Sequence, residues 1–331
     1  MNDLLPHGLD DFLAEAGWTG AVVEPLVGDA SFRRYFRLRA ADGSTAMLMD
    51  APPPQEDPRP FLHVAGWLAE HGMRAPRILA ARPDQGLVLL EDFGDARMRD
   101  WLDDHGGHEQ AVYAAAIDAL VALHAQPAGP FAPYDMAVYQ REAGLFTEWY
   151  CPAMGLSVDE DGWRTAWDAV LHPLLPRQTD PVTVLRDYHA ENIMLLDPAG
   201  PDGGAQGVID FQDALVGHRA YDLVSLLQDA RRDVPVELES AMLDRYCAAT
   251  GAGDDFRADY ARLGAQRNAK IVGIFARLWK RDGKARYLAF IPRVWDALER
   301  DLQHPALAPV AAWFAANVPQ EIRDTQGGEL Q

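Results

Sequence analysis

Hydrophobic residues follow two different patterns along the chain. Up to residue 92 they form short runs separated by turn residues, which is typical of β-strands. An Asp42-Gly43 pair marks a hairpin turn between two of these runs. The expected strands span residues 21–27, 34–40, 44–50, 76–81 and 87–90, and the expected helices of this part span 9–16 and 60–70.

After residue 108 the apolar residues recur every three or four positions, which predicts amphipathic helices. These helices are expected over residues 109–126, 163–174, 223–230, 236–250, 255–280, 284–302 and 306–317. Residues 131–155 lack this period and are predicted to be irregular and aromatic, and residues 326–331 are predicted to form a disordered tail. Trp149 and Tyr150 of the aromatic stretch suit stacking on a sugar ring, or packing in a core.

Residues 182–213 combine three short apolar runs with oxygen-bearing side chains at their ends. Asp187 follows the first run, Asn192 precedes the second, and Asp210 ends the third. Because short apolar runs bounded by turn residues indicate buried strands, these three side chains are expected at adjacent strand ends, where they can converge.

Phosphoryl transfer needs this combination of side chains. A carboxylate accepts or orients the proton of the attacking hydroxyl, while an amide oxygen and a second carboxylate hold Mg²⁺ against the nucleotide phosphates. Magnesium prefers hard oxygen ligands and takes few of them from protein. Asp187 is therefore the candidate base, and Asn192 and Asp210 are the candidate metal ligands.

Segments 186–192, 209–211 and 220–223 resemble the catalytic loop, the metal-binding segment and the Tyr-Asp-Leu segment of aminoglycoside phosphotransferase-like (protein-kinase-like) kinases of small molecules. The resemblance implies a bilobal α+β fold that binds ATP and Mg²⁺. Residues 1–92 would form the nucleotide-covering lobe, a small antiparallel sheet with one main helix. Residues 93–331 would form the larger, mostly helical catalytic and substrate lobe. Asp222 is expected to cap the helix that follows it and to brace the catalytic loop.

The same resemblance assigns a nucleotide site to the first lobe. Ser31 lies in the turn that would cover the phosphates, and backbone groups of Leu90, Glu91 and Asp92 would contact the adenine edge. The small-lobe lysine of such kinases is missing, because no lysine precedes Lys270. Arginine pairs well with phosphate, so one of Arg33, Arg34 and Arg37 is expected to replace it. A second departure is Leu185-Arg186-Asp187, where the family usually has His-Gly-Asp.

Within the family, the chain most resembles bacterial kinases that phosphorylate the anomeric hydroxyl of N-acetylmuramate and N-acetylglucosamine in cell-wall recycling. The resembling segments are 29–35, 90–95, 185–189, 225–231 and 277–284. The substrate-contacting candidates are Trp149, Tyr150, His189, Arg277 and Arg281, of which the two arginines suit the lactyl carboxylate of N-acetylmuramate.

Composition limits the alternatives. The net charge of −20 argues against nucleic acid and against an anionic membrane surface as partners. The two cysteines, Cys151 and Cys247, form no metal-ligand or disulfide pattern, and no targeting segment or long apolar run is present, so a cytoplasmic protein is expected. A monomer is expected as well. Three alternatives remain open: an aminoglycoside or amino-alcohol kinase, a kinase-like module without catalysis, and a metal hydrolase that uses His189 and His218.

Overall fold

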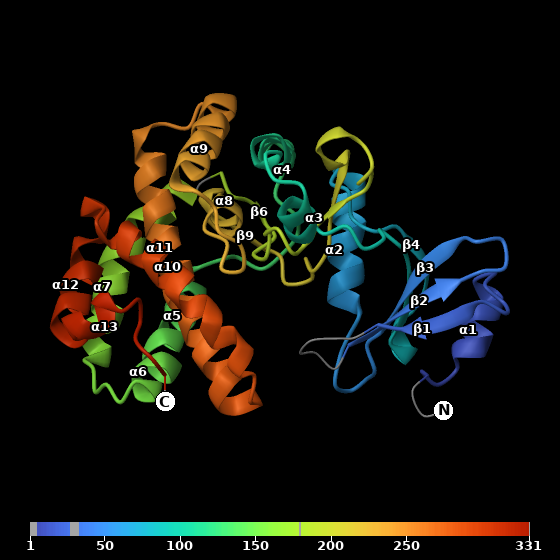
Figure 1. Cartoon of the computed structure of the whole chain (residues 1–331), viewed down its shortest axis with the longest axis horizontal. Helices are drawn as coiled ribbons and strands as arrows, with labels where there is room; N and C mark the ends of the chain where they lie inside the picture. Colours follow the sequence, from blue (N-terminus) through green and yellow to red (C-terminus); the bar gives the residue numbers. More distant parts are fainter. Residues whose placement is uncertain (1–4, 27–32, 179, 331) are drawn as a thin grey trace. The chain divides into compact units, whose positions relative to one another are not determined.

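The computed structural model describes residues 5–26, 33–178 and 180–330, and the chain divides into two compact units (Figure 1). The first unit contains Met1–Asp104 and Asn192–Asp213, and the second contains His105–Glu191 and Ala214–Gln331. The first unit thus takes in residues 93–104 and 192–213 in addition to residues 1–92. Across the described ranges, no helix is both long and apolar enough to cross a bilayer.

The first unit is built on an antiparallel five-stranded sheet with the order β1-β2-β3-β5-β4. Its strands are β1 (Val22–Pro25), β2 (Arg34–Arg39), β3 (Thr45–Asp50), β4 (Ile78–Arg82) and β5 (Leu87–Glu91). Its helices are α1 (Leu9–Glu15), α2 (Arg59–Glu70) and α3 (Met98–Asp104), with a 3₁₀ turn at Pro83–Gln85. The strands and helices predicted for this part of the chain are confirmed to within about two residues in the described ranges, whereas α3 was not predicted.

The hairpin between β2 and β3 forms where the Asp42-Gly43 signal predicted it. Gly43 takes a φ of 87°, which favours glycine, and Asp42 Oδ1 accepts hydrogen bonds from the amide and hydroxyl of Ser44 at 2.9 and 2.6 Å. Alternate residues of the strands then face one side of the sheet and pack with α1. This apolar core consists of Leu9, Phe12, Leu13, Phe36, Leu38, Ala46, Leu48, Leu87 and Leu89.

Residues 192–213 join the first unit as a second, two-stranded sheet of β7 (Ile193–Leu195) and β8 (Gln206–Val208), which are antiparallel. The connection between them includes a 3₁₀ turn at Pro201–Gly203. Two backbone hydrogen bonds tie the segment to the rest of the unit: Leu195 N–H donates to Ala96, and Val208 N–H donates to Arg74, both at 2.8 Å.

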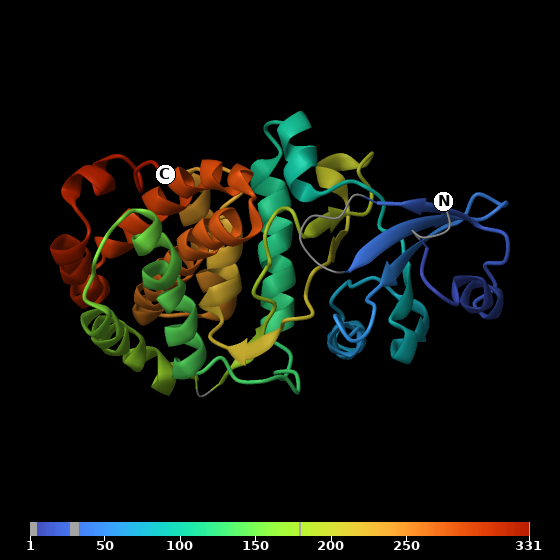
Figure 2. The same ribbon diagram turned by 90° about the horizontal axis from the view of Figure 1, so that it is seen from below.

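The second unit is mostly helical, and the long helix α10 (Asp254–Asp282) packs against α5 (Met136–Leu145), α8 (Ala220–Leu227) and α11 (Ile291–Leu302) (Figure 2). The remaining helices are α4 (Glu109–His124), α6 (Cys151–Ala153), α7 (Glu160–Leu171), α9 (Val236–Thr250), α12 (Ala308–Asn317) and α13 (Gln320–Asp324). A π-helical turn spans Phe146–Tyr150, and 3₁₀ turns span His172–Gln178, Ala285–Phe290 and Pro305–Leu307. The strands β6 (Val182–Val184) and β9 (Leu215–Gly217) pair antiparallel.

Several predictions for the second unit were wrong. Residues 131–155 are mainly helical: Asp135 caps α5 by accepting the Val138 amide at 3.0 Å, and the buried face of α5 contains the polar Glu142, which interrupts its apolar pattern. Strand β6 pairs with β9, which was not predicted, and not with β7 or β8. Helix α11 begins only at Ile291, after a 3₁₀ turn. Among residues 326–330, the carbonyl of Gly327 accepts a hydrogen bond from the buried Tyr150 hydroxyl at 2.6 Å, so this part of the tail is packed.

Candidate active site

The loop that carries Asp187 is held by two carboxylates and one phenol of the second unit. Asp222 accepts the amides of Leu185 and Arg186 at 2.7 and 2.8 Å. Asp229 accepts the amide of Ala190 at 3.1 Å. Tyr188 donates its hydroxyl to the carbonyl of Ala116 at 2.9 Å. Asp222 therefore braces the loop as predicted, but it lies inside α8 instead of capping a helix that begins after it.

Arg186 has a left-handed backbone with a φ of 72°, a conformation that glycine adopts readily and other residues adopt at a cost. The kinases that the sequence resembles usually have glycine at this position. The guanidinium of Arg186 is paired with the buried carboxylate of Glu142, which also pairs with Lys270 at 3.0 Å and accepts the Tyr134 hydroxyl. Burial alone would raise the pKa of Glu142, but Lys270 and Arg186 outweigh burial and hold it below its ordinary value.

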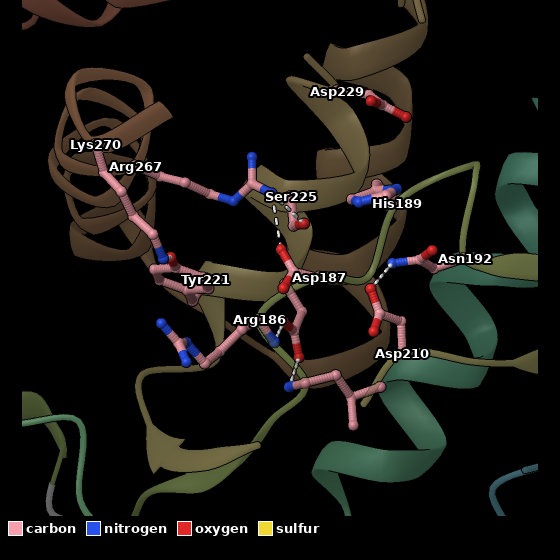
Figure 3. Close-up of polar contacts among 12 residues, drawn as sticks. Arg186, Asp187, His189, Asn192, Asp210, Tyr221, Ser225, Asp229, Arg267 and Lys270 are labelled. Carbon is pink, nitrogen blue, oxygen red and sulfur yellow. Dashed lines mark hydrogen bonds and ion pairs between the residues drawn. The ribbon is translucent and has the colours of Figure 1, made fainter. Parts of the chain in front are cut away.

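Asp187 lies among cations of the second unit (Figure 3). Arg267 of α10 places a terminal nitrogen 3.9 Å from Asp187 Oδ1 and donates to Ser225 Oγ at 2.8 Å. Burial raises the pKa of Asp187, but Lys270, His189, Arg267 and Arg186 lower it by more, so the net shift is downward. Because the side chain is 47% exposed, water weakens this effect without changing its direction. Asp187 is thus ionised at neutral pH and able to accept a proton.

Asn192 and Asp210 come together in the first unit because the β7–β8 hairpin brings its two ends side by side. The Ile209 amide donates to the carbonyl of Asn192 at 3.0 Å, and the Asn192 side-chain nitrogen lies 3.5 Å from Asp210 Oδ2 (Figure 3). Asp210 also has a left-handed backbone, with a φ of 61°, and accepts Gln212 Nε2 at 2.9 Å. An amide oxygen and an exposed carboxylate on one hairpin are hard donors of the kind that Mg²⁺ prefers, so this pair fits the expected metal.

The three arginines of β2 and its approach have different partners. Arg37 is buried and pairs with Asp92 at 2.8 Å and with Asp95 at 2.8 Å, and Arg34 pairs with the buried Asp50. Arg33 pairs with Glu56 at 3.0 Å.

Tyr35 shows which of these arginines lies near the metal-ligand candidate. Burial raises the pKa of Tyr35, Arg33 lowers it, and the charges of Asp210 and Glu56 raise it further. Arg33 and Asp210 therefore both influence the ionisation of the same phenol within the first unit.

The residues predicted to contact adenine belong to β5 and the turn after it. Leu90 is buried and pairs with Met47 of β3 and Ile78 of β4, and the Glu91 amide donates to the Arg77 carbonyl. The Glu91 carboxylate accepts from Arg74 at 2.6 and 2.8 Å, which lowers its pKa to about 2. Ser31 lies outside the described residues.

The candidate substrate residues lie in different environments of the second unit. Tyr150 is fully buried among Phe146 and Trp295, a placement that favours core packing, whereas Trp149 is half-buried. His189 is 4% exposed, and its Nε2 lies 3.3 Å from an Arg231 nitrogen. Burial, reinforced by Arg231, lowers the pKa of His189 to about 4, so its ring is neutral at pH 7.

The two arginines near the end of α10 also differ. Arg281 is exposed and pairs with its neighbour Asp282 at 2.7 Å. Arg277 is half-buried, and its Nε is without a hydrogen-bond partner among the described residues.

Glu142, Ser225, Arg267 and Lys270 were not predicted as site residues from the sequence. A signal was present for the last two: residues 266–270 interrupt the apolar face of a long helix with four polar side chains, one of them among only three lysines in the chain. Polar side chains in a buried helical segment are retained where they have partners.

Comparison with known proteins identifies the family of the chain. Residues 22–265 match the phosphotransferase enzyme family. An N-acetylmuramate/N-acetylglucosamine kinase of Caulobacter vibrioides is 40% identical over 94% of this chain and 96% of its own. A protein of the same name from Pseudomonas aeruginosa is 40% identical over 97% of this chain and 96% of its own.

The fold has solved counterparts as well. The crystal structure of a choline kinase from Streptococcus pneumoniae superposes with a TM-score of 0.63 at 12% identity, over 91% of this chain and 97% of its own. The predicted α+β kinase-like fold is thereby confirmed.

Proposed function

Because the chain belongs to the phosphotransferase enzyme family, we propose that it transfers the γ-phosphate of ATP to the anomeric hydroxyl of N-acetylmuramate and N-acetylglucosamine. The observation that supports this substrate is the 40% identity, over nearly the whole chain, to two bacterial kinases named for these sugars. The sugar 1-phosphate would serve cell-wall recycling towards nucleotide-activated amino sugars.

In this reaction Asp187 is the base. Its carboxylate accepts the proton of the attacking hydroxyl, and the surrounding cations keep it ionised for that purpose. The loop around it is held by Asp222 and Asp229, so the carboxylate does not have to be ordered when substrate binds.

Asn192 and Asp210 are the residues that would hold Mg²⁺ through their side-chain oxygens. The bound ion would neutralise charge on the β- and γ-phosphates. The left-handed backbone of Asp210 costs about 1 kcal/mol or more. Strained backbone of this kind is found most often at functional sites, which is consistent with a role of Asp210 as a metal ligand.

Arg33 is the best candidate to replace the missing lysine of the first unit. Arg37 is committed to Asp92 and Asp95, and Arg34 pairs with Asp50, which is buried. Arg33 shares the surroundings of Tyr35 with Asp210, and Glu56 anchors its guanidinium. An arginine can donate to phosphate oxygens with its planar fork of N–H groups.

The end of α10 is the proposed site for the lactyl carboxylate of N-acetylmuramate. Arg277, Lys280, Arg281 and Lys284 lie close to Asp282 in the sequence, and the pKa of Asp282 is lowered first by Arg281 and then by Lys284 and Arg277. Four cations and one carboxylate leave a net positive charge. Arg277 is the stronger candidate, because Arg281 already pairs with Asp282 in solvent.

The test is ATP consumption by the purified protein with Mg²⁺, using N-acetylmuramate, N-acetylglucosamine, an aminoglycoside and choline as separate acceptors. We expect turnover on the two amino sugars and its loss in Asp187→Asn. Arg277→Gln should raise the KM for N-acetylmuramate while leaving that for the uncharged N-acetylglucosamine nearly unchanged. Turnover confined to the aminoglycoside or choline would refute the substrate assignment, and nucleotide binding without any turnover would favour the non-catalytic module.

A further inference from the structure

Arg267 is a buried cation on α10 whose contacts converge on Asp187. Its side chain is 3% exposed, and one terminal nitrogen, Nη2, donates to Ser225 Oγ at 2.8 Å and lies 3.9 Å from Asp187 Oδ1 (Figure 3). Among the described residues, Asp187 is the only ion-pair partner of Arg267, and its other terminal nitrogen, Nη1, has no hydrogen-bond partner.

Stability does not explain this arrangement. Burying a guanidinium removes its hydration, and a donor left without a partner adds a further desolvation cost. A buried charged group of this kind can often be replaced by apolar residues without loss of stability. A contribution to function therefore explains the position of Arg267 between Ser225 and Asp187 better than a contribution to stability does.

The other charged groups that face Asp187 make contacts with other partners. Arg186, on the same loop, and Lys270, on α10, both pair with Glu142, and Lys270 Nζ also lies 3.1 Å from the Tyr221 hydroxyl. His189 is neutral at pH 7, and Asp222, on α8, is occupied by two loop amides. Arg267, in turn, forms its ion pair with Asp187 itself.

We propose that Arg267 is a positioning residue, which Ser225 holds in place and which fixes the orientation of the Asp187 carboxylate towards the attacking hydroxyl. The inference rests on the proposed function. In the transfer step the acceptor O–H bond breaks and its proton passes to Asp187. The acceptor oxygen forms a bond to the γ-phosphorus, and the bond between that phosphorus and ADP breaks. Arg267 itself touches neither substrate nor proton.

Three variants and one control test this role by steady-state kinetics. Arg267→Gln removes the charge, Arg267→Lys keeps it, and Ser225→Ala removes the bond that orients the guanidinium. We expect kcat to fall roughly a hundredfold in Arg267→Gln and about tenfold in Ser225→Ala, with KM within about twofold, because misplacing a catalytic group costs rate more than binding. Arg267→Lys should recover part of the loss. The control Arg245→Gln breaks an exposed pair with Asp118, at 2.6 and 2.7 Å, and should keep the wild-type kcat.

The pH dependence separates positioning from a general loss of structure. Without the positive charge the carboxylate is less favoured, so the acidic limb of the kcat profile should move to higher pH in Arg267→Gln but stay in place in Arg267→Lys. A rise in KM with unchanged kcat, or an unmoved limb, would overturn the inference. If Arg267→Gln does not fold, the Ser225→Ala variant provides the test. A wild-type kcat in Ser225→Ala would also overturn the inference that Arg267 is a positioning residue.

A second readout does not need turnover. In protein labelled with ¹³C at aspartate carboxyls, the signal of Asp187, assigned from its loss in Asp187→Asn, can be titrated in wild type and in Arg267→Gln. We expect the midpoint to rise in the variant, and an unchanged midpoint would contradict the inference. Because this titration needs no acceptor, it can succeed even if the protein phosphorylates neither amino sugar, so failures of the two proposals are distinguishable.

Discussion

The residue before the candidate base offers a quantitative test of the loop, because Arg186 combines a left-handed backbone with a buried ion pair. Two substitutions separate these features. Arg186→Ala removes the ion pair with Glu142 and leaves a side chain on the left-handed backbone. Arg186→Gly removes the same ion pair and relieves the backbone as well.

The magnitudes follow from the contacts. Losing the hydrogen-bonded pair with Glu142 should lower the free energy of unfolding by about 2 kcal/mol in both variants, because Lys270 and Tyr134 remain to compensate that carboxylate. The left-handed backbone costs a non-glycine residue about 1–2 kcal/mol, and glycine gives back about 0.5–1 kcal/mol through the greater freedom of the unfolded chain. Arg186→Gly should therefore be more stable than Arg186→Ala by about 1 kcal/mol.

Urea unfolding followed by tryptophan fluorescence measures this difference, with the slopes compared to ensure that the variants unfold alike. The matched control is Arg245 in the middle of α9, where an ordinary helical backbone should reverse the order and make Arg245→Ala the more stable variant by about 1 kcal/mol. If alanine is as stable as glycine at position 186, then the left-handed backbone is not strained and the reasoning fails.

Three further predictions concern the rest of the chain. Burial raises the pKa of Asp222 from 3.8 to about 7, so its contribution to stability is complete below about pH 4 and is lost as the pH rises through 7; relative to Asp222→Asn, wild type should lose up to about 4 kcal/mol of unfolding free energy between pH 4 and 8 in urea titrations. The pKa of Glu91 is lowered by Arg74 and Arg77, so Glu91→Gln should cost about 2 kcal/mol at pH 7, and that difference should shrink as the pH falls from about 4.5 towards 2. Gly86→Ala would place its Cβ 2.1 Å from the Ala51 carbonyl oxygen and should cost about 3 kcal/mol or more by urea unfolding, whereas Gly72→Ala, with a similar φ and open space, should cost about 1 kcal/mol; equal costs would contradict the packing argument.

The sequence predicted the local features that short-range patterns determine. The runs at 182–184, 193–195 and 206–208 are strands, and the β7–β8 hairpin brings Asn192 to Asp210 because each flanks one of its strands. Helix α5 was missed because its buried face, which includes Tyr139, Glu142 and Ala143, mixes polar and apolar residues and so lacks a purely apolar stripe.

Contacts between residues far apart in the sequence could not be predicted from short-range patterns. Ser225 and Arg267 are 42 residues apart, and Glu142 and Arg186 are 44 apart, so their pairing depends on how α5, α8 and α10 pack. The left-handed conformation of Arg186 left no mark in the sequence either, since the residue type argues against it. The departure from the usual glycine was visible, but its compensation by Glu142 was not.

The composition of the first unit from two chain segments has a consequence for synthesis on the ribosome. After Asp104 has been made, the unit still lacks β7, β8 and the residues that bond to Ala96 and Arg74. A further 109 residues, from 105 to 213, must be added before the unit is complete. At translation rates of about 5–20 residues per second this takes roughly 5–20 s. During that interval the nascent five-stranded sheet exists without residues 192–213, the second segment of the first unit. Helix α4 and strand β6 of the second unit emerge before the first unit is complete.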